Sequence, residues 1–347
     1  GTPLLRTAAI NEPRLEYDAS GNPLGLLIEE ARTNVLAYSE GFTSGWSDTF
    51  CSTTANAIAS PDGAVSGAKL QEDSSGTGGP RAYPSVNAVL TANQAQTLSC
   101  FFKAGTSAYA YLTIRHSNGN VAAVEFDLTS GTVNSTTVSG NMTLNSSDIT
   151  SVGNDWYRCS VTATSSASTT SGFYFLAMTD GSGVTSAGYP NYALTGKNIY
   201  AWGAQVETGA FPTSYIPTSG STVTRAVDSA VATLSDFYYR QKNGSMVVEF
   251  TSKYDESAAL YKKVCEIGNT GTSVNRILLV AKTDVTRLTS SVWDNGSLQY
   301  STTLTSSLPN GTGVYSKVAM AWETNNAHAA LDGDLVGSVD TAVSLTQ

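Results

Sequence analysis

Short segments in which apolar and polar residues alternate recur along most of the chain, and Gly, Ser and Asn separate them. The sharpest alternation runs from Tyr109 to Arg115, where Ala110, Leu112 and Ile114 fall on one face. A period of two places successive side chains on opposite faces of a strand. This pattern therefore predicts a sheet that packs on a core with one face and is half exposed on the other.

The residues that usually cover the exposed faces of helices are scarce in this chain. Only 14% of the 347 residues are charged, whereas 88 are Ser or Thr. Exposed helix faces normally carry Lys, Glu and Arg, while Ser, Thr, Asn and Gly suit strands and turns. We therefore expect an all-β protein with two β-sandwich domains, of the jelly-roll or lectin-like kind, preceded by an extended N-terminal arm.

The charge and the hydropathy exclude two classes of partner. With 19 Lys and Arg against 28 Asp and Glu, the formal net charge is -9, which argues against binding to nucleic acid. No apolar run approaches the ~18 residues of a membrane-spanning helix, so we expect no membrane insertion. The chain begins at Gly1 without a signal-like segment, and we expect it to be part of a longer protein.

Prolines and turn residues divide the chain into four parts. Residues 1–34, interrupted by three prolines, predict an arm that lies on its own body or on another subunit. Residues 35–215 predict the jelly roll, 216–244 a linker and the first part of the next domain, and 245–347 a lectin-like sandwich that is incomplete. The expected strands are 98–103, 108–115, 121–128, 156–164, 173–178 and 199–206, followed by 245–252, 263–267, 276–281, 286–293 and 314–322.

Cysteine and histidine are too sparse to indicate a cofactor or a metal centre. Cys100 and Cys159 occupy apolar positions of expected strands, which favours buried thiols, with a Cys100–Cys159 disulfide as the alternative. His116 and His328 are expected in exposed turns. Asp180-Gly181 and Asp332-Gly333-Asp334 read as turns, with a Ca²⁺ site built from their oxygens as the weaker alternative.

Motifs of catalysis are also missing. The chain has no GxSxG, HExxH or GxxxxGK[ST] motif. Glycoside hydrolysis needs two acids that face each other across the sugar bond, about 5–10 Å apart. The neighbouring acids Glu29-Glu30 and Glu72-Asp73 would point to opposite faces of a strand. We therefore expect no enzymatic activity.

Three stretches resemble a known family. Gly25-Leu-Leu-Ile-Glu-Glu-Ala-Arg-Thr-Asn34 resembles a segment that precedes a carbohydrate-binding-module-like domain in bacteriophage virion proteins. Ala201-Trp-Gly-Ala-Gln-Val-Glu207, with Ser214-Tyr-Ile-Pro-Thr218 and Thr224-Arg225, resembles the segment that closes that domain, and Asp155-Trp-Tyr-Arg158 is similar to one of its inner strands. The second half resembles a concanavalin-A-like lectin sandwich through Ala329-Ala-Leu-Asp-Gly333.

The resemblance implies a head-fibre, spike or tail-fibre protein on the virion surface. Its partners would be other capsid or tail proteins, host cell-surface glycans and further copies of itself, for which we expect a homotrimer. The resemblance carries no catalytic residues. One alternative is a non-catalytic carbohydrate-binding module of a secreted polysaccharide-degrading enzyme, and another is a decoration protein with no ligand.

Sugar binding needs an aromatic ring for the C–H face of a pyranose and polar groups for its hydroxyls. Tyr109, Tyr111 and Arg115 share the polar face of their expected strand and meet this description. The remaining candidates, expected on loops at the rim of the sandwich, are Trp46, Arg81 and Tyr83. The alternative is that this face is covered by the arm or by a neighbouring subunit. We expect Glu29, Arg32 and Asn34 to hold the arm to the body rather than to contact a ligand.

Overall fold

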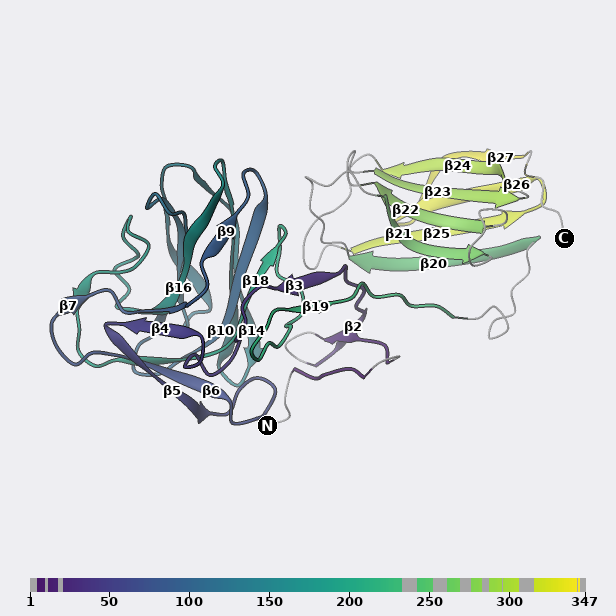
Figure 1. The fold of residues 1–347 in the computed structure, drawn as a ribbon. Coiled ribbons are helices and arrows are strands. Elements are labelled where there is room, and N and C mark those ends of the chain that lie inside the picture. The colour runs from purple at the N-terminus through teal and green to yellow at the C-terminus, as the bar shows by residue number, and fades with distance from the viewer. Residues whose placement is uncertain are drawn as a thin grey trace. The chain divides into compact units, whose positions relative to one another are not determined.

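The computed structural model describes residues 5–9, 12–17, 21–232, 242–251, 261–268, 276–282, 287–294, 296–305, 315–341 and 343. The chain divides into two compact units, residues 1–230 and 231–347. Both units consist of strands and connections, and the described residues contain no helix (Figure 1). The expected all-β fold with two β-sandwiches is confirmed.

Two antiparallel sheets face each other across one core in the first unit (Figure 1). The first sheet has the order β14-β15-β10-β18-β6-β5, with β5 (Cys51–Ile58), β6 (Gly67–Glu72), β10 (Ala95–Ala104), β14 (Met142–Gly153), β15 (Trp156–Ser165) and β18 (Asn198–Thr208). The second has the order β13-β12-β11-β16-β8-β4, with β4 (Trp46–Thr49), β8 (Arg81–Pro84), β11 (Tyr109–Arg115), β12 (Val121–Asp127), β13 (Thr132–Val138) and β16 (Thr169–Thr179). Strand β9 (Ala88–Leu90) pairs with β16, and β7 (Thr77–Gly78) pairs with β17 (Tyr192–Ala193).

The core between these sheets is built from the apolar faces that the sequence indicates. Ala110, Leu112 and Ile114 of β11 are fully buried in it, together with Leu98 and Leu176 from β10 and β16. Sequence analysis missed several strands, among them β13 and β14, each of which forms one edge of a sheet. Ser and Thr are frequent in both strands. Most side chains of the two strands are exposed or half-buried, so neither strand carries a continuous apolar face that could be recognised.

The two motifs that bracket the first domain in sequence are neighbours in space. Strand β3 (Arg32–Asn34) pairs with β19 (Val223–Arg225), and the arm before it forms the hairpin of β1 (Leu15–Tyr17) and β2 (Pro23–Leu26). The buried Asn34 amide donates to the carbonyl oxygens of Ala204 and Ile216. This arrangement confirms that Asn34 holds the arm to the body.

An ion-pair cluster stabilises the same junction. Glu29 accepts hydrogen bonds from the Arg14 guanidinium at 2.7 Å and from the Ser214 backbone N–H at 2.7 Å, and pairs with Arg225 at 3.0 Å. Arg14 also pairs with Asp228. The expected structural role of Glu29 is therefore confirmed.

In the second unit, two four-stranded sheets enclose a separate core. One has the order β20-β25-β26-β27, with β20 (Asn243–Thr251), β25 (Tyr315–Glu323), β26 (Asn326–Leu331) and β27 (Asp334–Asp340). The other has the order β21-β22-β23-β24, with β21 (Tyr261–Gly268), β22 (Arg276–Lys282), β23 (Arg287–Asp294) and β24 (Ser297–Thr305). Strand β23 pairs with β24 as far as Asp294 and Ser297, and β25 pairs with β26 as far as Glu323 and Asn326.

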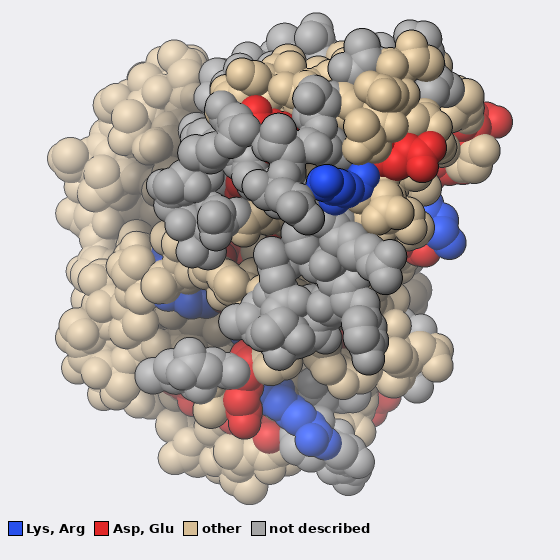
Figure 2. Space-filling view, turned by 90° about the vertical axis from the view of Figure 1, so that its right-hand side faces the viewer, with Lys and Arg blue, Asp and Glu red and all other residues tan. Residues whose placement is uncertain are grey.

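Charged side chains are sparse on the surface, as the composition predicts. Figure 2 shows Lys and Arg as a few separate spots among other described residues on one face, without a continuous basic area. A search of the described residues found no helix with the length and apolarity needed to cross a membrane.

The four cysteines are free thiols. Cys100 on β10 and Cys159 on β15 lie directly opposite each other, and both are fully buried in the core. The Cys100 thiol donates to the Trp202 carbonyl oxygen at 3.4 Å. The expectation of buried thiols is confirmed, and the alternative disulfide is absent.

We expect the native protein to resist alkylation at three of these thiols. Burial raises the pKa of the Cys51 thiol to about 12 and also raises the pKa values of the Cys100 and Cys159 thiols well above their ordinary value, so the reactive thiolate is scarce. With iodoacetamide at mildly alkaline pH, these three should react at least about 100-fold more slowly than in denaturing guanidinium chloride. Peptide mass mapping measures each site, and rapid native labelling of Cys100 or Cys159 would contradict the buried core.

Candidate functional site

Tyr111, expected on a half-exposed face, is part of the interior. Strand β11 lies between β12 and β16, and the Tyr111 side chain is 0% exposed. Its hydroxyl donates to the Pro80 carbonyl oxygen at 2.7 Å, and burial raises the pKa of the phenol well above its ordinary value. A sugar cannot stack on this ring, so the expectation that Tyr111 contacts a glycan is wrong.

The segment 180–190, between β16 and β17, covers this part of the sheet. Thr113 on the same face as Tyr111 donates its hydroxyl hydrogen to the Gly188 carbonyl oxygen at 2.8 Å. The buried Glu125 carboxylate holds the beginning of the segment by accepting from the Gly183 backbone N–H at 3.1 Å and from the Thr179 hydroxyl. Tyr109, half-buried, lies against Gly181. The face is thus covered by its own chain rather than by the arm.

Trp46, expected on a rim loop, is also a packing residue. It begins β4, is only 8% exposed, and its ring meets Phe42 edge-on with 4.8 Å between ring centroids. The indole N–H donates to the Tyr38 carbonyl oxygen at 2.9 Å. Trp46 therefore has neither a free face nor a free donor for a sugar, and its assignment to the rim is wrong.

Three of the remaining predicted residues, Arg81, Tyr83 and Arg115, come together on the outer face of the second sheet of the first unit. Arg81 and Tyr83 lie on β8 rather than on a loop, and Arg115 ends β11. Aromatic rings from β16 and from the covering segment connect them. We call this group the arginine–aromatic strip; its half-buried members are Arg81, Tyr83, Arg115, Phe173 and Tyr189.

Ring contacts run through the whole strip and pass through the buried Phe175. Arg115 lies over the Phe173 ring at 5.5 Å, and Phe173 stacks on Phe175 with 5.6 Å between centroids. Phe175 meets Tyr83 and Tyr189 edge-on at 5.9 and 6.0 Å. At the far end the Arg81 guanidinium lies 4.3 Å from the centre of the Tyr189 ring. The strip therefore presents arginines at both ends of a rigid aromatic surface.

Neither arginine of the strip is neutralised by a carboxylate. Among the described residues, Arg81 and Arg115 take part in no ion pair, whereas Arg14, Arg32 and Arg225 each have an acidic partner. Arg81 donates to the Gly79 carbonyl oxygen at 3.0 Å, which holds its guanidinium over Tyr189. The Nε atom of Arg115 is buried without a hydrogen-bond partner. Both cations can thus bind an external anion without first breaking an ion pair.

Sequence analysis missed two members of the strip. Phe173 pairs with Arg115 across β11 and β16, which places its ring under the guanidinium at the edge of the covered face. Phe173 and Phe175 are two residues apart on one strand, a spacing that indicates that both rings lie on the same face. Tyr189 lies on an irregular segment, and no periodicity could have placed it.

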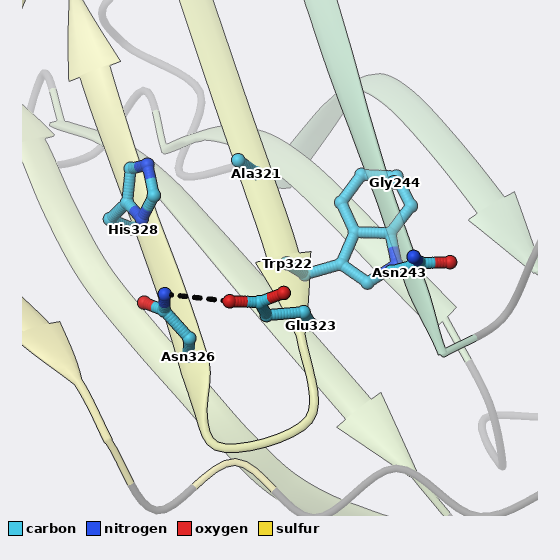
Figure 3. A pocket seen from close by; sticks show the side chains of 7 residues that line it. All are labelled: Asn243, Gly244, Ala321, Trp322, Glu323, Asn326 and His328. Carbon is cyan, nitrogen blue, oxygen red and sulfur yellow. Dashed lines mark hydrogen bonds between the residues drawn. The ribbon is translucent and has the colours of Figure 1, made fainter.

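A hollow of about 250 Å³ lies at one end of the sheet β20-β25-β26-β27 in the second unit. Figure 3 shows its lining residues, which come from three neighbouring strands: Asn243, Gly244, Ala321, Trp322, Glu323, Asn326 and His328. Gly244 pairs with Trp322, and a Cβ atom at position 244 would lie 2.5 Å from the indole Cζ2 atom. Only glycine leaves room for the indole at this position. No feature of the sequence analysis pointed to this hollow.

His116 differs from its sequence-based expectation. Its ring is 5% exposed rather than free in a turn, and its Nδ1 atom accepts from the Asn118 backbone N–H at 3.2 Å. His328 is half-buried on β26 instead of lying in a turn. The hairpin around each histidine supplies this cover, and sequence spacing cannot show it.

The acidic candidates serve local structure. Glu72 is buried and accepts hydrogen bonds from the Tyr192 hydroxyl at 2.5 Å and from the Lys197 backbone N–H at 3.0 Å. Asp180 accepts from the Ser182 backbone N–H, and Asp332 from the Lys317 backbone N–H. The described residues contain no group of three or more His, Cys, Asp or Glu side chains that could hold a metal ion. The weaker alternative of a Ca²⁺ site at the two Asp-Gly turns stays a prediction.

Comparison with known proteins assigns no family to the chain. No family model matches it, and no curated protein matches its sequence. Among solved structures, it is similar to domains LG4-5 of the mouse laminin alpha1 chain, with 10% identity and a TM-score of 0.21. That alignment covers 76% of this chain and 77% of the laminin chain. A likeness at this level carries no argument about function.

Proposed function

We propose that this chain is a non-enzymatic virion protein of a bacteriophage, in a capsid fibre, spike or tail fibre, whose β-sandwiches attach the particle to host-surface glycans. The observation that carries the binding part of this proposal is the arginine–aromatic strip. It combines half-buried aromatic rings, which suit the C–H face of a pyranose, with two guanidinium groups that pair with no described carboxylate. The location in the virion and the contacts with other capsid or tail proteins rest on the sequence resemblance. The assembly of this chain into a homotrimer rests on it too.

The strip favours a particular class of glycan. Arg81 and Arg115 carry charge that the described carboxylates do not neutralise, in a chain whose formal net charge is -9. Local positive charge of this kind matches a carboxylate or sulfate on a sugar, and a guanidinium binds either group through paired N–H donors. We therefore assign the strip to acidic saccharides, such as those that contain uronic or sialic acids.

Binding at one strip is weak in this proposal, and the particle compensates by copy number. The strip is a half-buried surface rather than a deep pocket, so a bound sugar stays largely hydrated. Many copies on one particle raise the avidity without any new contact. This makes a multivalent assay necessary.

A glycan array tests the proposal with the full chain coupled to beads at high density. We expect retention on saccharides that carry uronic or sialic acid, and weaker retention when the salt is raised from about 0.1 M to about 1 M, because salt screens charges at the protein surface. Analysis of the array sugars after incubation should show no shortened products. Retention on none of the acidic saccharides would contradict the proposed ligand, and shortened products would contradict a non-enzymatic role.

A second candidate is the accessory binding module of a secreted polysaccharide-degrading enzyme, which the same strip would serve. The two differ in where the chain is found. Mass spectrometry of purified particles should detect this chain in the virion under our proposal. Its detection only in culture medium, joined to a hydrolase domain, would favour the alternative.

A further inference from the structure

The hollow in the second unit contains polar atoms that the protein leaves without partners. The Asn326 side-chain N–H donates to a Glu323 carboxylate oxygen at 3.0 Å, which fixes the orientation of the amide (Figure 3). In that orientation the Asn326 Oδ1 atom is buried and accepts no hydrogen bond from the described residues, and the neighbouring His328 Nδ1 atom likewise has no described partner. Because nearly all buried polar atoms in proteins have a partner, two such atoms at one hollow point to an external ligand.

The strand register explains why these groups meet. Glu323 lies opposite Asn243 on one side and Asn326 on the other, and Ala321 lies opposite His328. Polar side chains from three strands therefore converge over a floor formed by the small residues Ala321 and Gly244. Three adjacent strands of one sheet hold the groups rigidly, so a ligand need not order them.

We propose that this hollow binds a single uncharged pyranose ring of a glycan. Asn326 Oδ1 and the Glu323 carboxylate can only accept hydrogen bonds, and sugar hydroxyls supply the donors. The Trp322 indole is only 4% exposed and belongs to the core of this unit, so it forms part of the wall of the hollow rather than a stacking surface. The volume is below the roughly 300–1,000 Å³ of sites for drug-sized ligands, which suits one ring. The described residues that line the hollow include no Lys or Arg, and this chemistry disfavours an anionic sugar.

This inference goes beyond the proposed function because it concerns other residues, in the other unit, with the opposite charge preference. The arginine–aromatic strip is assigned to acidic saccharides, whereas the hollow is assigned to neutral ones. Either assignment can fail while the other holds, since the two sites share no residue.

Saturation-transfer NMR of the full chain tests the assignment. The probes are the methyl pyranosides of glucose, galactose, mannose and N-acetylglucosamine, with methyl glucuronide as the acidic comparison. We expect signals from at least one neutral glycoside and a weaker signal from the glucuronide at the same concentration. Signals from none of the neutral glycosides, or a preference for the glucuronide, would overturn the proposal.

Two substitutions locate the signal. Ala321→Leu fills the hollow from its floor, and Asn326→Ala removes the unpartnered acceptor; each should lower the affinity by at least about tenfold, equivalent to 1.4 kcal/mol. The matched control is Ala319→Leu, which adds the same volume on the same face of β25 two residues away, opposite Val247 and Ala330. It should leave the affinity unchanged. Unchanged binding in both Ala321→Leu and Asn326→Ala would also overturn the proposal.

Discussion

Tyr111→Ala should lower the free energy of unfolding of the first unit by about 3–5 kcal/mol, the cost of removing a large aromatic side chain from a core. The ring is fully buried, and its loss also leaves the Pro80 carbonyl oxygen without its hydrogen bond. For a unit of this size the thermal midpoint should fall by roughly 6–20 °C. Calorimetry of the full chain measures it.

Two further variants separate the contributions of the ring and of its hydroxyl. Tyr111→Phe keeps the ring but leaves the buried Pro80 oxygen unpartnered, and should cost about 1–3 kcal/mol. Tyr109→Ala changes a half-buried tyrosine on the same strand and should cost clearly less than Tyr111→Ala. Equal losses for Tyr109→Ala and Tyr111→Ala would contradict the burial of Tyr111 under the segment 180–190.

Asn34→Ala should have an effect of similar size, because one buried side chain satisfies four backbone groups. Its amide donates to the Ala204 and Ile216 carbonyl oxygens, and its Oδ1 atom accepts from the backbone N–H groups of Leu36 and Val206. Each buried group left without a partner costs about 1–3 kcal/mol, so we expect a total loss of about 3–5 kcal/mol after partial relaxation. Chemical denaturation measures it.

The same variant should also release the arm. Asn34 joins the opening segment to β18, and β3 pairs with β19 beside it. Limited proteolysis should therefore cleave residues 12–30 at least about tenfold faster in Asn34→Ala than in the wild type. The exposed Asn87, in the turn between β8 and β9, supplies the control variant Asn87→Ala. Identical cleavage rates in Asn34→Ala and Asn87→Ala would show that the arm is held by other contacts.

Periodicity predicted the architecture because apolar alternation survives in the strands that face a core. The strands around Leu98, Leu112 and Val318 were found because apolar residues at alternate positions of each strand face a core. Strands β13 and β14 were missed because most of their side chains are exposed or half-buried and neither strand has a continuous apolar face. The fold class thus follows from a local pattern, whereas strands without an apolar face do not.

The candidate site was predictable only in part, because alternation distinguishes the two faces of a strand but not what covers them. Tyr111 and Arg115 share one face, yet the segment 180–190 covers Tyr111 and leaves Arg115 half exposed. Arg81 and Tyr83 were expected on rim loops but lie on strand β8, and the contribution of Tyr189 depends on the course of an irregular segment. The hollow of the second unit depends on strand register, which the sequence alone did not provide.

The most direct measurement compares the retention of three multivalent proteins on an immobilised uronic-acid polysaccharide. They are the wild type, the double variant Arg81→Gln/Arg115→Gln and the control Arg6→Gln/Lys69→Gln. The control removes the same charge from the first unit outside the strip. We expect the strip variant to lose at least about tenfold in affinity, equivalent to 1.4 kcal/mol, while the control stays within about twofold of the wild type. Equal retention of the strip variant and the wild type would contradict the assignment of host attachment to the arginine–aromatic strip.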